Sequence, residues 1–390
     1  MRKALKWIGW LALMTVLITI AVGVWKREEI ARLLAVNSLF AEDKIVSNFS
    51  NMNAAFLSVP VPRGEGPVSP LPNGPEARLP QETEAWIKDH AVTSLVVLKD
   101  GAVVHESYHL GTTAGDRRIS WSVAKSYLSA LIGILLEEGA IDSLDDPVTK
   151  YAPALVDSAY DGSTIRNVLN MASGVVFDED YLDPDSDINR MGRVIALGGR
   201  LDDFTVDLKE SFADPGTDWQ YVSIDTHVLS MVVRGATDRS IPTLLSEKVI
   251  APMGLEAEPY YLTDGAGTAF VLGGLNLTSR DYARFGQMYL QNGRWNGEQI
   301  VPADWVAAST RASAPTGPDE LGYGYQWWIP HGAREGEFLA RGVYGQYIYI
   351  NRAAGVVIAT TAAHRGFRAE GAHERNVEIF RAITDSLNGG

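Results

Sequence analysis

Ser122 and Lys125 lie three residues apart at the start of an apolar stretch that runs to Gly139. Residues at positions i and i+3 share one face of a helix, so a hydroxyl and an amine in this pattern can meet. A serine nucleophile needs an adjacent base of this kind to take its proton. The start of a helix also offers free backbone N–H groups to an oxyanion. The pattern Ser-x-x-Lys, which occurs once in the chain, predicts acyl transfer through a covalent intermediate on Ser122.

Two later segments complete a three-part pattern. Tyr221 and Ser223 form a Tyr-x-Ser sequence after a turn-rich segment, and Gly342, Val343 and Gly345 lie in a run with strand character. Ser-x-x-Lys, then Tyr-x-Ser, then a glycine-containing strand is the order found in penicillin-recognising serine enzymes. The chain resembles the β-lactamase-related serine hydrolases over about residues 80–390. It is most similar to the branch that holds 6-aminohexanoate-dimer hydrolase and class C-like esterases.

The resemblance implies a role for each residue of the first two motifs. Ser122 would attack a carbonyl group, and Lys125 and Tyr221 would share the acid and base steps. Lys125 must be neutral to accept a proton, so its pKa has to be lowered by its surroundings. Ser223 would form a hydrogen bond near Lys125. The sequence leaves open whether Lys125 or Tyr221 is the formal base.

The third motif would complete an oxyanion hole. By analogy with the family, the two donors are the backbone N–H groups of Ser122 and Val343. Gly342 and Gly345 suit a strand whose backbone must approach the substrate closely.

The third motif also departs from the family pattern. Class C β-lactamases carry Lys-Thr-Gly where this chain has Ala340, Arg341 and Gly342. The missing lysine and threonine normally hold the carboxylate of a β-lactam or a D-alanyl peptide. Arg341 supplies a charge, but at the position of the threonine. The departure disfavours β-lactam hydrolysis and leaves ester or amide hydrolysis open.

Three further side chains are candidates for the substrate pocket. Tyr181 is one because related amidases use a tyrosine from the helical region, and Arg341 is another because of its place in the third motif. Trp327 and Trp328 are adjacent in a predicted strand, where neighbouring side chains point to opposite faces. At most one indole can therefore face the substrate, and Trp327 is the one we assign to the pocket.

Two other sequence patterns resemble metal-binding motifs but are better explained without a bound metal ion. His105 and His109 match the zinc-protease sequence His-Glu-x-x-His, which works only on a helix. In a strand they would lie about 13 Å apart, too far to share one zinc ion. The acidic run at residues 178–187 lacks the spacing of a calcium-binding loop and is expected to be a solvated loop. The sequence implies no metal and no organic cofactor.

Composition limits the class of partner. The formal net charge is −14, and 46% of the residues are hydrophobic. A chain this acidic lacks the basic patch that nucleic-acid binding requires. Cysteine is absent, which excludes disulfides and thiolate metal sites and leaves the redox compartment undetermined.

The N-terminus predicts membrane attachment. Three basic residues precede an uncharged run from Trp7 to Trp25, whose length of about 28 Å as a helix is close to that of a bilayer core. No small-x-small cleavage site follows, which favours an uncleaved single-pass anchor over a signal peptide. The basic residues mildly favour a cytoplasmic N-terminus, so the catalytic domain would be periplasmic or otherwise extracytoplasmic.

The rest of the chain divides by composition. We expect an anchor at residues 1–27, a stalk and proline-rich connector at 28–80, and a hydrolase domain at 81–390 with a mostly helical insertion at about 141–299. Strand patterns near both ends of the domain predict an antiparallel sheet flanked by helices, an α+β sandwich. The strands are expected at 92–110, 323–329, 337–351 and 355–362, with a closing helix at 373–387. The resemblance implies a β-lactamase/transpeptidase-like fold.

Three functions remain for such a chain. The first is a serine hydrolase for small ester or amide substrates. The second is a D-alanyl peptidase or β-lactamase, which the altered third motif disfavours. The third is a non-catalytic, membrane-tethered binding module, which would have no chemical need for Ser122, Lys125 and Tyr221 together.

Overall fold

The centre of the fold is a seven-stranded sheet in the strand order β3-β2-β13-β12-β11-β10-β9. The computed structural model describes residues 2–318 and 320–389. All neighbouring strands of this sheet pair antiparallel, so the predicted antiparallel architecture is confirmed. The strands are β2 (Val92–Lys99), β3 (Ala102–Tyr108), β9 (Gly322–Tyr323), β10 (Trp328–Ile329), β11 (Glu337–Gly342), β12 (Gln346–Asn351) and β13 (Val356–Ala362).

The first two strands form the hairpin that the sequence predicts. β2 and β3 are joined at Asp100 and Gly101, which have φ angles of 50° and 86°. Such left-handed conformations are typical of tight hairpin turns and suit Asp and Gly. The run at 337–351, by contrast, is not continuous. It divides into β11 and β12 around the short helix η5 (Val343–Gly345).

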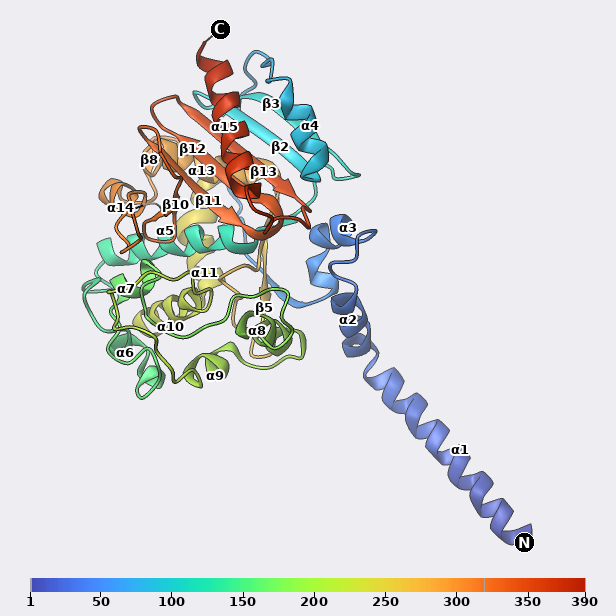
Figure 1. Cartoon of the computed structure of the whole chain (residues 1–390). Coiled ribbons are helices and arrows are strands. Elements are labelled where there is room, and N and C mark those ends of the chain that lie inside the picture. The colour runs from blue at the N-terminus through green and yellow to red at the C-terminus, as the bar shows by residue number, and fades with distance from the viewer. Residues whose placement is uncertain (1, 319, 390) are drawn as a thin grey trace.

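Helices cover both faces of the sheet (Figure 1). α4 (Glu82–Asp89) and α15 (Ala372–Asn388) lie on one face, where Trp86 and Phe380 pack edge to face at 5.8 Å. α5 (Ala124–Glu137) and α13 (Ser279–Leu290) lie on the other. α13 approaches the strands so closely that a Cβ on Gly286 would meet Val357 at 2.6 Å.

The predicted helical insertion is largely helical but also carries strands. Its longest helices are α10 (Asp225–Thr237) and α13, followed by α8 (Asp187–Ala196). Shorter ones are α6 (Val148–Tyr151), α7 (Ile165–Leu169), α9 (Leu201–Val206), α11 (Ile241–Leu245) and α12 (Ala251–Met253). Strands β5 (Tyr260–Thr263) and β6 (Leu275–Leu277) join β1 (Leu57–Pro60) and β4 (Arg118–Ile119) in a second sheet, of order β1-β5-β6-β4.

The prediction that residues 28–80 form a stalk and connector outside the folded domain is wrong for much of this segment. α2 (Arg27–Asn37) is followed by α3 (Ile45–Ser50), and Leu39, Phe49 and Met52 are buried in the main hydrophobic core. Because β1 pairs with β5, this segment is an integral part of the folded domain. The sequence did not reveal this because its apolar residues are spaced irregularly between short elements.

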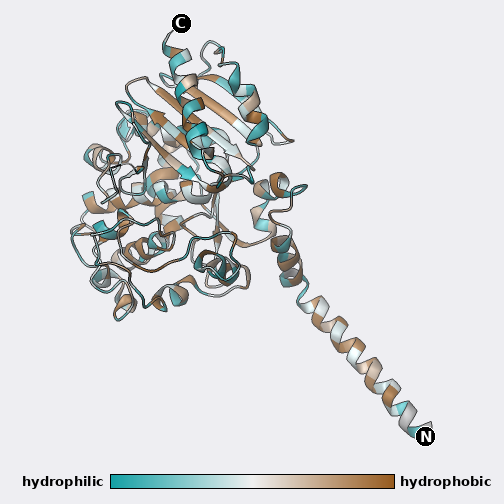
Figure 2. Ribbon diagram, viewed as in Figure 1, coloured by the Kyte–Doolittle hydropathy of each residue, from teal (hydrophilic) through white to brown (hydrophobic). Residues whose placement is uncertain are grey.

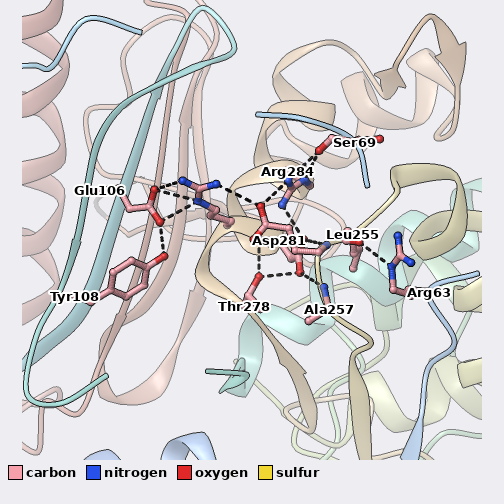
Figure 3. A network of polar contacts seen from close by, with 11 residues as sticks. Arg63, Ser69, Glu106, Tyr108, Leu255, Ala257, Thr278, Asp281 and Arg284 are labelled. Carbon is pink, nitrogen blue, oxygen red and sulfur yellow. Dashed lines mark hydrogen bonds and ion pairs between the residues drawn. The ribbon is translucent and has the colours of Figure 1, made fainter. Parts of the chain in front are cut away.

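The proline-rich part, residues 60–80, is extended as predicted but is fixed in place by hydrogen bonds (Figure 3). Arg284 on α13 is 1% exposed and donates two hydrogen bonds to the carbonyl of Ser69, at 3.1 and 2.9 Å. The same guanidinium pairs with Asp281 at 2.9 Å. Arg63 donates to the carbonyl of Leu255 at 2.9 Å. These bonds make the connector part of the packed structure.

α1 (Arg2–Trp25) stands apart from the rest of the protein (Figures 1 and 2). Its segment Lys6–Trp25 has 20 residues and a mean hydropathy of 2.2, and none of its most apolar window is buried. By length and composition this helix can cross a membrane, and the same properties fit a signal sequence.

Candidate active site

Ser122 lies at a sharp bend between β4 and α5, within the short helix η2 (Trp121–Val123). Trp121, the residue before it, has a φ of 43°, a left-handed conformation that a bulky side chain rarely adopts. Such strain persists only where surrounding packing enforces it. The Trp121 ring packs against Phe49, with ring centroids 5.5 Å apart. The bend presents the Ser122 hydroxyl at the start of α5.

Lys125 lies in the first turn of α5 and is 1% exposed. Its Nζ donates a hydrogen bond to the carbonyl of Leu272 at 3.1 Å. Burial lowers the pKa of Lys125 to about 7, against the negative charges of Glu179 and Asp225, which act to raise it. A large share of Lys125 is therefore neutral near pH 7, which is what a proton acceptor beside Ser122 requires.

Tyr221 comes from the loop before α10 and faces Ser122 and Lys125. Its ring centroid is 5.5 Å from Lys125 Nζ. Burial is the main cause that raises the pKa of Tyr221, and the negative charge of Glu179 adds to it. A hydrogen bond with Ser122 and the positive charge of Arg341 lower this pKa in part. The phenol therefore keeps its proton at neutral pH and can donate it. The structure thus brings together the three residues that the sequence singled out.

The end of β11 lies directly beside the backbone of Ser122. A Cβ on Gly342 would meet the Ser120 carbonyl at 2.6 Å and the Ser122 nitrogen at 3.1 Å, so only glycine fits there without movement. Val343 follows and lines the same cavity as Ser122. Gly345 has a φ of 89°, which explains why the turn after Val343 carries glycine.

Glu179 is a site residue that the sequence reasoning missed. Its carboxylate accepts hydrogen bonds from the backbone N–H of Ser223, at 2.5 Å, and from the hydroxyl of Tyr181, at 3.2 Å. Burial raises the pKa of Glu179, and the positive charge of Lys125 opposes that rise. Its neighbours Asp178 and Asp183 are exposed, as expected for a solvated acidic loop. The one available signal was that Phe177 and Tyr181 flank Glu179 with aromatic side chains.

A cavity of about 430 Å³ opens beside Ser122. Ser223, Val343 and Tyr181 also line it. The edge of the Tyr181 ring faces Phe367 at 5.9 Å.

Trp327 and Arg341 do not line this cavity. The assignment of Trp327 to the pocket was wrong, because its indole is fully buried and stacks on Phe285 in the core. Trp328 is the indole near the site, stacked on Tyr221 at 5.2 Å. The guanidinium of Arg341 lies over the Trp328 ring at 5.4 Å, so Arg341 acts on Tyr221 as a nearby charge.

The two histidines of the zinc-protease sequence and the nearby Asp225 have structural partners. His105 and His109 lie on or just after strand β3 and both contact the Ser107 hydroxyl at 3.0 Å, so the zinc-protease geometry is not formed. Asp225 accepts hydrogen bonds from Tyr160 and Ser173 at 2.7 and 2.9 Å. Within residues 2–318 and 320–389, no group of three or more His, Asp or Glu side chains is arranged to hold a metal ion.

Known proteins share both the sequence pattern and this fold. A family model described as β-lactamase matches residues 84–380. The chain is 31% identical to a 6-aminohexanoate-dimer hydrolase of Paenarthrobacter ureafaciens over 288 residues, 70% of this chain and 73% of that protein.

Two solved structures show the same fold. A Bacillus anthracis protein provisionally named as a 6-aminohexanoate-dimer hydrolase superposes with a TM-score of 0.82 at 24% identity, covering 90% of this chain and 96% of that one. EstCE1, a hydrolase with promiscuous acyltransferase activity, superposes with a TM-score of 0.60 at 17% identity, covering 78% and 96%. The β-lactamase/transpeptidase-like fold is therefore confirmed. With the matches spanning most of its length, the chain belongs to the β-lactamase family and is a serine hydrolase.

Proposed function

We propose that this protein cleaves small esters or amides through an acyl-enzyme on Ser122, with Lys125 and Tyr221 as the acid and base. The observation that carries this proposal is the buried amine of Lys125 one helical turn after Ser122, whose pKa burial lowers to about 7. A lysine held in this way has no evident structural use, because burying an amine without a carboxylate partner in direct contact destabilises a fold.

The geometry supports a two-step reaction. Lys125, in its neutral form, takes the Ser122 proton as the hydroxyl oxygen bonds to the substrate carbonyl carbon. Tyr221, which keeps its proton at neutral pH, passes a proton to the departing alcohol or amine and is reprotonated by Lys125. Water then attacks the acyl-enzyme, and the same pair returns the proton to Ser122. The backbone N–H groups of Ser122 and Val343 would hold the oxyanion in both steps.

The relative that is 31% identical is named for hydrolysis of an amide, the 6-aminohexanoate dimer, which supports an amidase or esterase over a β-lactamase. The position of Arg341 against Trp328 also argues against a carboxylate clamp of the β-lactamase kind. A D-alanyl peptidase or β-lactamase would instead be supported if benzylpenicillin acylated Ser122.

We also propose that α1 anchors the protein in a membrane with the catalytic domain on the extracytoplasmic side. The exposed apolar surface of this helix and its length support the anchor. The three basic residues ahead of the uncharged run from Trp7 to Trp25 outnumber the two directly after it, Lys26 and Arg27, which supports the orientation.

The proposal is tested by brief exposure to p-nitrophenyl acetate followed by intact mass and peptide mapping. We expect the wild-type protein to gain one acetyl group on the peptide that contains Ser122, and Ser122→Ala to gain none. Ser386→Ala, on α15 across the sheet, is the matched control and should acylate normally. Acetylation elsewhere, or an unlabelled wild type that releases no p-nitrophenol, would refute the proposed nucleophile.

Glu179→Gln is expected to shift the pH dependence of hydrolysis. The negative charge of Glu179 raises the pKa of Lys125, so removing that charge lowers this pKa. Because Lys125 acts in its neutral form, the rise of kcat/KM with pH, which we expect near pH 7 in the wild type, should move to lower pH. Profiles from about pH 5 to about pH 9 would show the shift. Asp185→Asn, an exposed change in the same loop, should leave the profile in place.

A further inference from the structure

The cavity beside Ser122 has one wall that comes from outside the region matched by the β-lactamase family model. Leu39 and Phe40 follow α2, and Met52 and Phe56 follow α3; all four line the cavity. The Phe40 ring stacks on Tyr344, with centroids 5.2 Å apart and planes at 12°. The N-terminal segment therefore closes one side of the pocket with apolar and aromatic surface.

The opposite wall is the apolar side of helix α8. Ile188, Met191 and Ile195 face the cavity and are at most 8% exposed. α8 also contacts α2 directly. The two walls enclose a space whose volume of about 430 Å³ is in the range of sites that bury most of a small ligand.

The polar side chains that line the cavity either form hydrogen bonds within the protein or lie at the ends of the cavity. The amide of Asn189 donates to the carbonyls of Asp180, Tyr181 and Asp183, at 3.3, 3.1 and 2.7 Å, and so holds the loop before α8. Arg193 donates to the carbonyl of Pro184. Ser122 and Ser223 lie at the catalytic end. Arg193 also belongs to the cavity lining and is exposed; along the apolar walls away from it, a charged group on a ligand would lose its water without gaining a partner.

The rim of the cavity carries large apolar side chains in addition to Arg193. Leu182 is 82% exposed and Phe40 is 42% exposed, and both line the cavity. Large exposed apolar side chains that surround a cavity mark a place where an apolar ligand enters.

We propose, on the basis of the acyl-enzyme function above, that this cavity is an acyl-chain pocket and that the substrates are neutral esters or amides of linear, medium-length fatty acids. Ser122 Oγ bonds to the carbonyl carbon of the fatty acyl group, and the alcohol or amine leaves with a proton from the Lys125–Tyr221 pair. Water then releases the free fatty acid and restores Ser122. The walls from the N-terminal segment and α8 set the chain length.

Gly192 on α8 offers a way to fill the pocket without disturbing the backbone. It lines the cavity, and a Cβ built on it meets no atom within 4 Å. Gly192→Phe should therefore place a ring in the acyl pocket. Gly115→Phe adds the same ring at an exposed glycine outside the cavity, where a Cβ again meets no atom within 4 Å.

The test uses the full chain in lipid nanodiscs and p-nitrophenyl esters from acetate to octanoate. We expect kcat/KM of the wild type to rise by up to about fourfold per methylene, the factor that corresponds to one buried methylene. Gly192→Phe should lower the octanoate-to-acetate ratio by at least about tenfold, while Gly115→Phe keeps the wild-type trend. The p-nitrophenyl ester of 6-aminohexanoate, with its charged chain end, should react at least about tenfold less efficiently than the hexanoate ester.

The outcomes separate this inference from the function on which it rests. Hydrolysis of acetate through Ser122 with no rise along the series, or a preference for the charged ester, would overturn the acyl pocket and leave the serine hydrolase intact. A folded Gly192→Phe protein with an unchanged ratio would also overturn it. If Gly192→Phe does not fold, the dependence of wild-type kcat/KM on the length of the acyl chain still tests the acyl pocket. No turnover of any ester would overturn the proposed function and the acyl pocket together.

Discussion

Lys125→Met is expected to lower kcat/KM by about 10²–10⁴-fold, because it removes the group that takes the proton from Ser122. The same change is expected to raise the free energy of unfolding by about 1–3 kcal/mol at neutral pH. Lys125 is 1% exposed, and within residues 2–318 and 320–389 no carboxylate forms a hydrogen bond with it. Methionine fills a similar volume without a charge to desolvate. Loss of activity together with a gain in stability is the signature of a strained catalytic group.

The stability gain has a defined pH dependence. Burial lowers the pKa of Lys125 from 10.5 to about 7, so between these values the unfolded chain binds the proton more tightly than the folded protein. The free energy of unfolding of the wild type therefore rises with pH in this window. The destabilisation caused by burying the charged amine of Lys125 is fully present below about pH 7. The advantage of Lys125→Met should be largest there and should shrink toward pH 10.

Urea unfolding of both proteins at several pH values measures this difference. Lys150→Met removes a lysine that contacts Asp142 and Asp146 at the surface, and it should change neither activity nor the trend with pH. A Lys125→Met protein that is active, or that is less stable than the wild type below pH 7, would contradict the assignment of Lys125 as a buried base.

Gly342→Ala is expected to lower kcat/KM by about 10²–10³-fold, the usual effect of losing one oxyanion donor. The new Cβ would lie 2.6 Å from the Ser120 carbonyl and 3.1 Å from the Ser122 nitrogen. Backbone atoms cannot yield as side chains do, so the end of β11 must move away from Ser122. Val343 moves with it, and its N–H no longer points to the oxyanion.

Stopped-flow acylation and circular dichroism would distinguish this effect from unfolding. We expect a folded Gly342→Ala protein with slow acylation and KM changed less than kcat. Gly66→Ala, at an exposed glycine where a Cβ meets no atom within 4 Å, should behave as the wild type. A normal acylation rate in Gly342→Ala would show that Val343 is not an oxyanion donor.

The elements that were predicted correctly from the sequence have strong local sequence patterns. The hairpin of β2 and β3 combines alternating strands with an Asp-Gly turn, and the closing helix α15 has a regular amphipathic pattern. Residues 39–56 have no such period, because α3 is six residues long and the apolar side chains between short elements point inward only in the folded protein. Their packing could not be predicted from local pattern alone.

The same distinction applies to the site. Ser122, Lys125 and Tyr221 could be proposed from the sequence because each belongs to a short motif of fixed residue types, Ser-x-x-Lys or Tyr-x-Ser. Glu179 lies in an acidic loop, and its approach to Ser223 depends on how that loop folds over α10. The choice between Trp327 and Trp328 failed for a related reason. Alternation shows that two neighbours face opposite ways, but only the register of β10 decides which one faces the core.

The packing of the N-terminal segment gives the molecule a defined response to mechanical force. α1 continues through Lys26 into α2, and Leu39 and Phe40 follow within a few residues. A pull along α1 is therefore delivered first to the side of the cavity that Phe40 closes, well before it reaches the seven-stranded sheet. Because Leu39 and Phe40 line the cavity, displacing this segment from the folded domain would open the side of the pocket that these residues close.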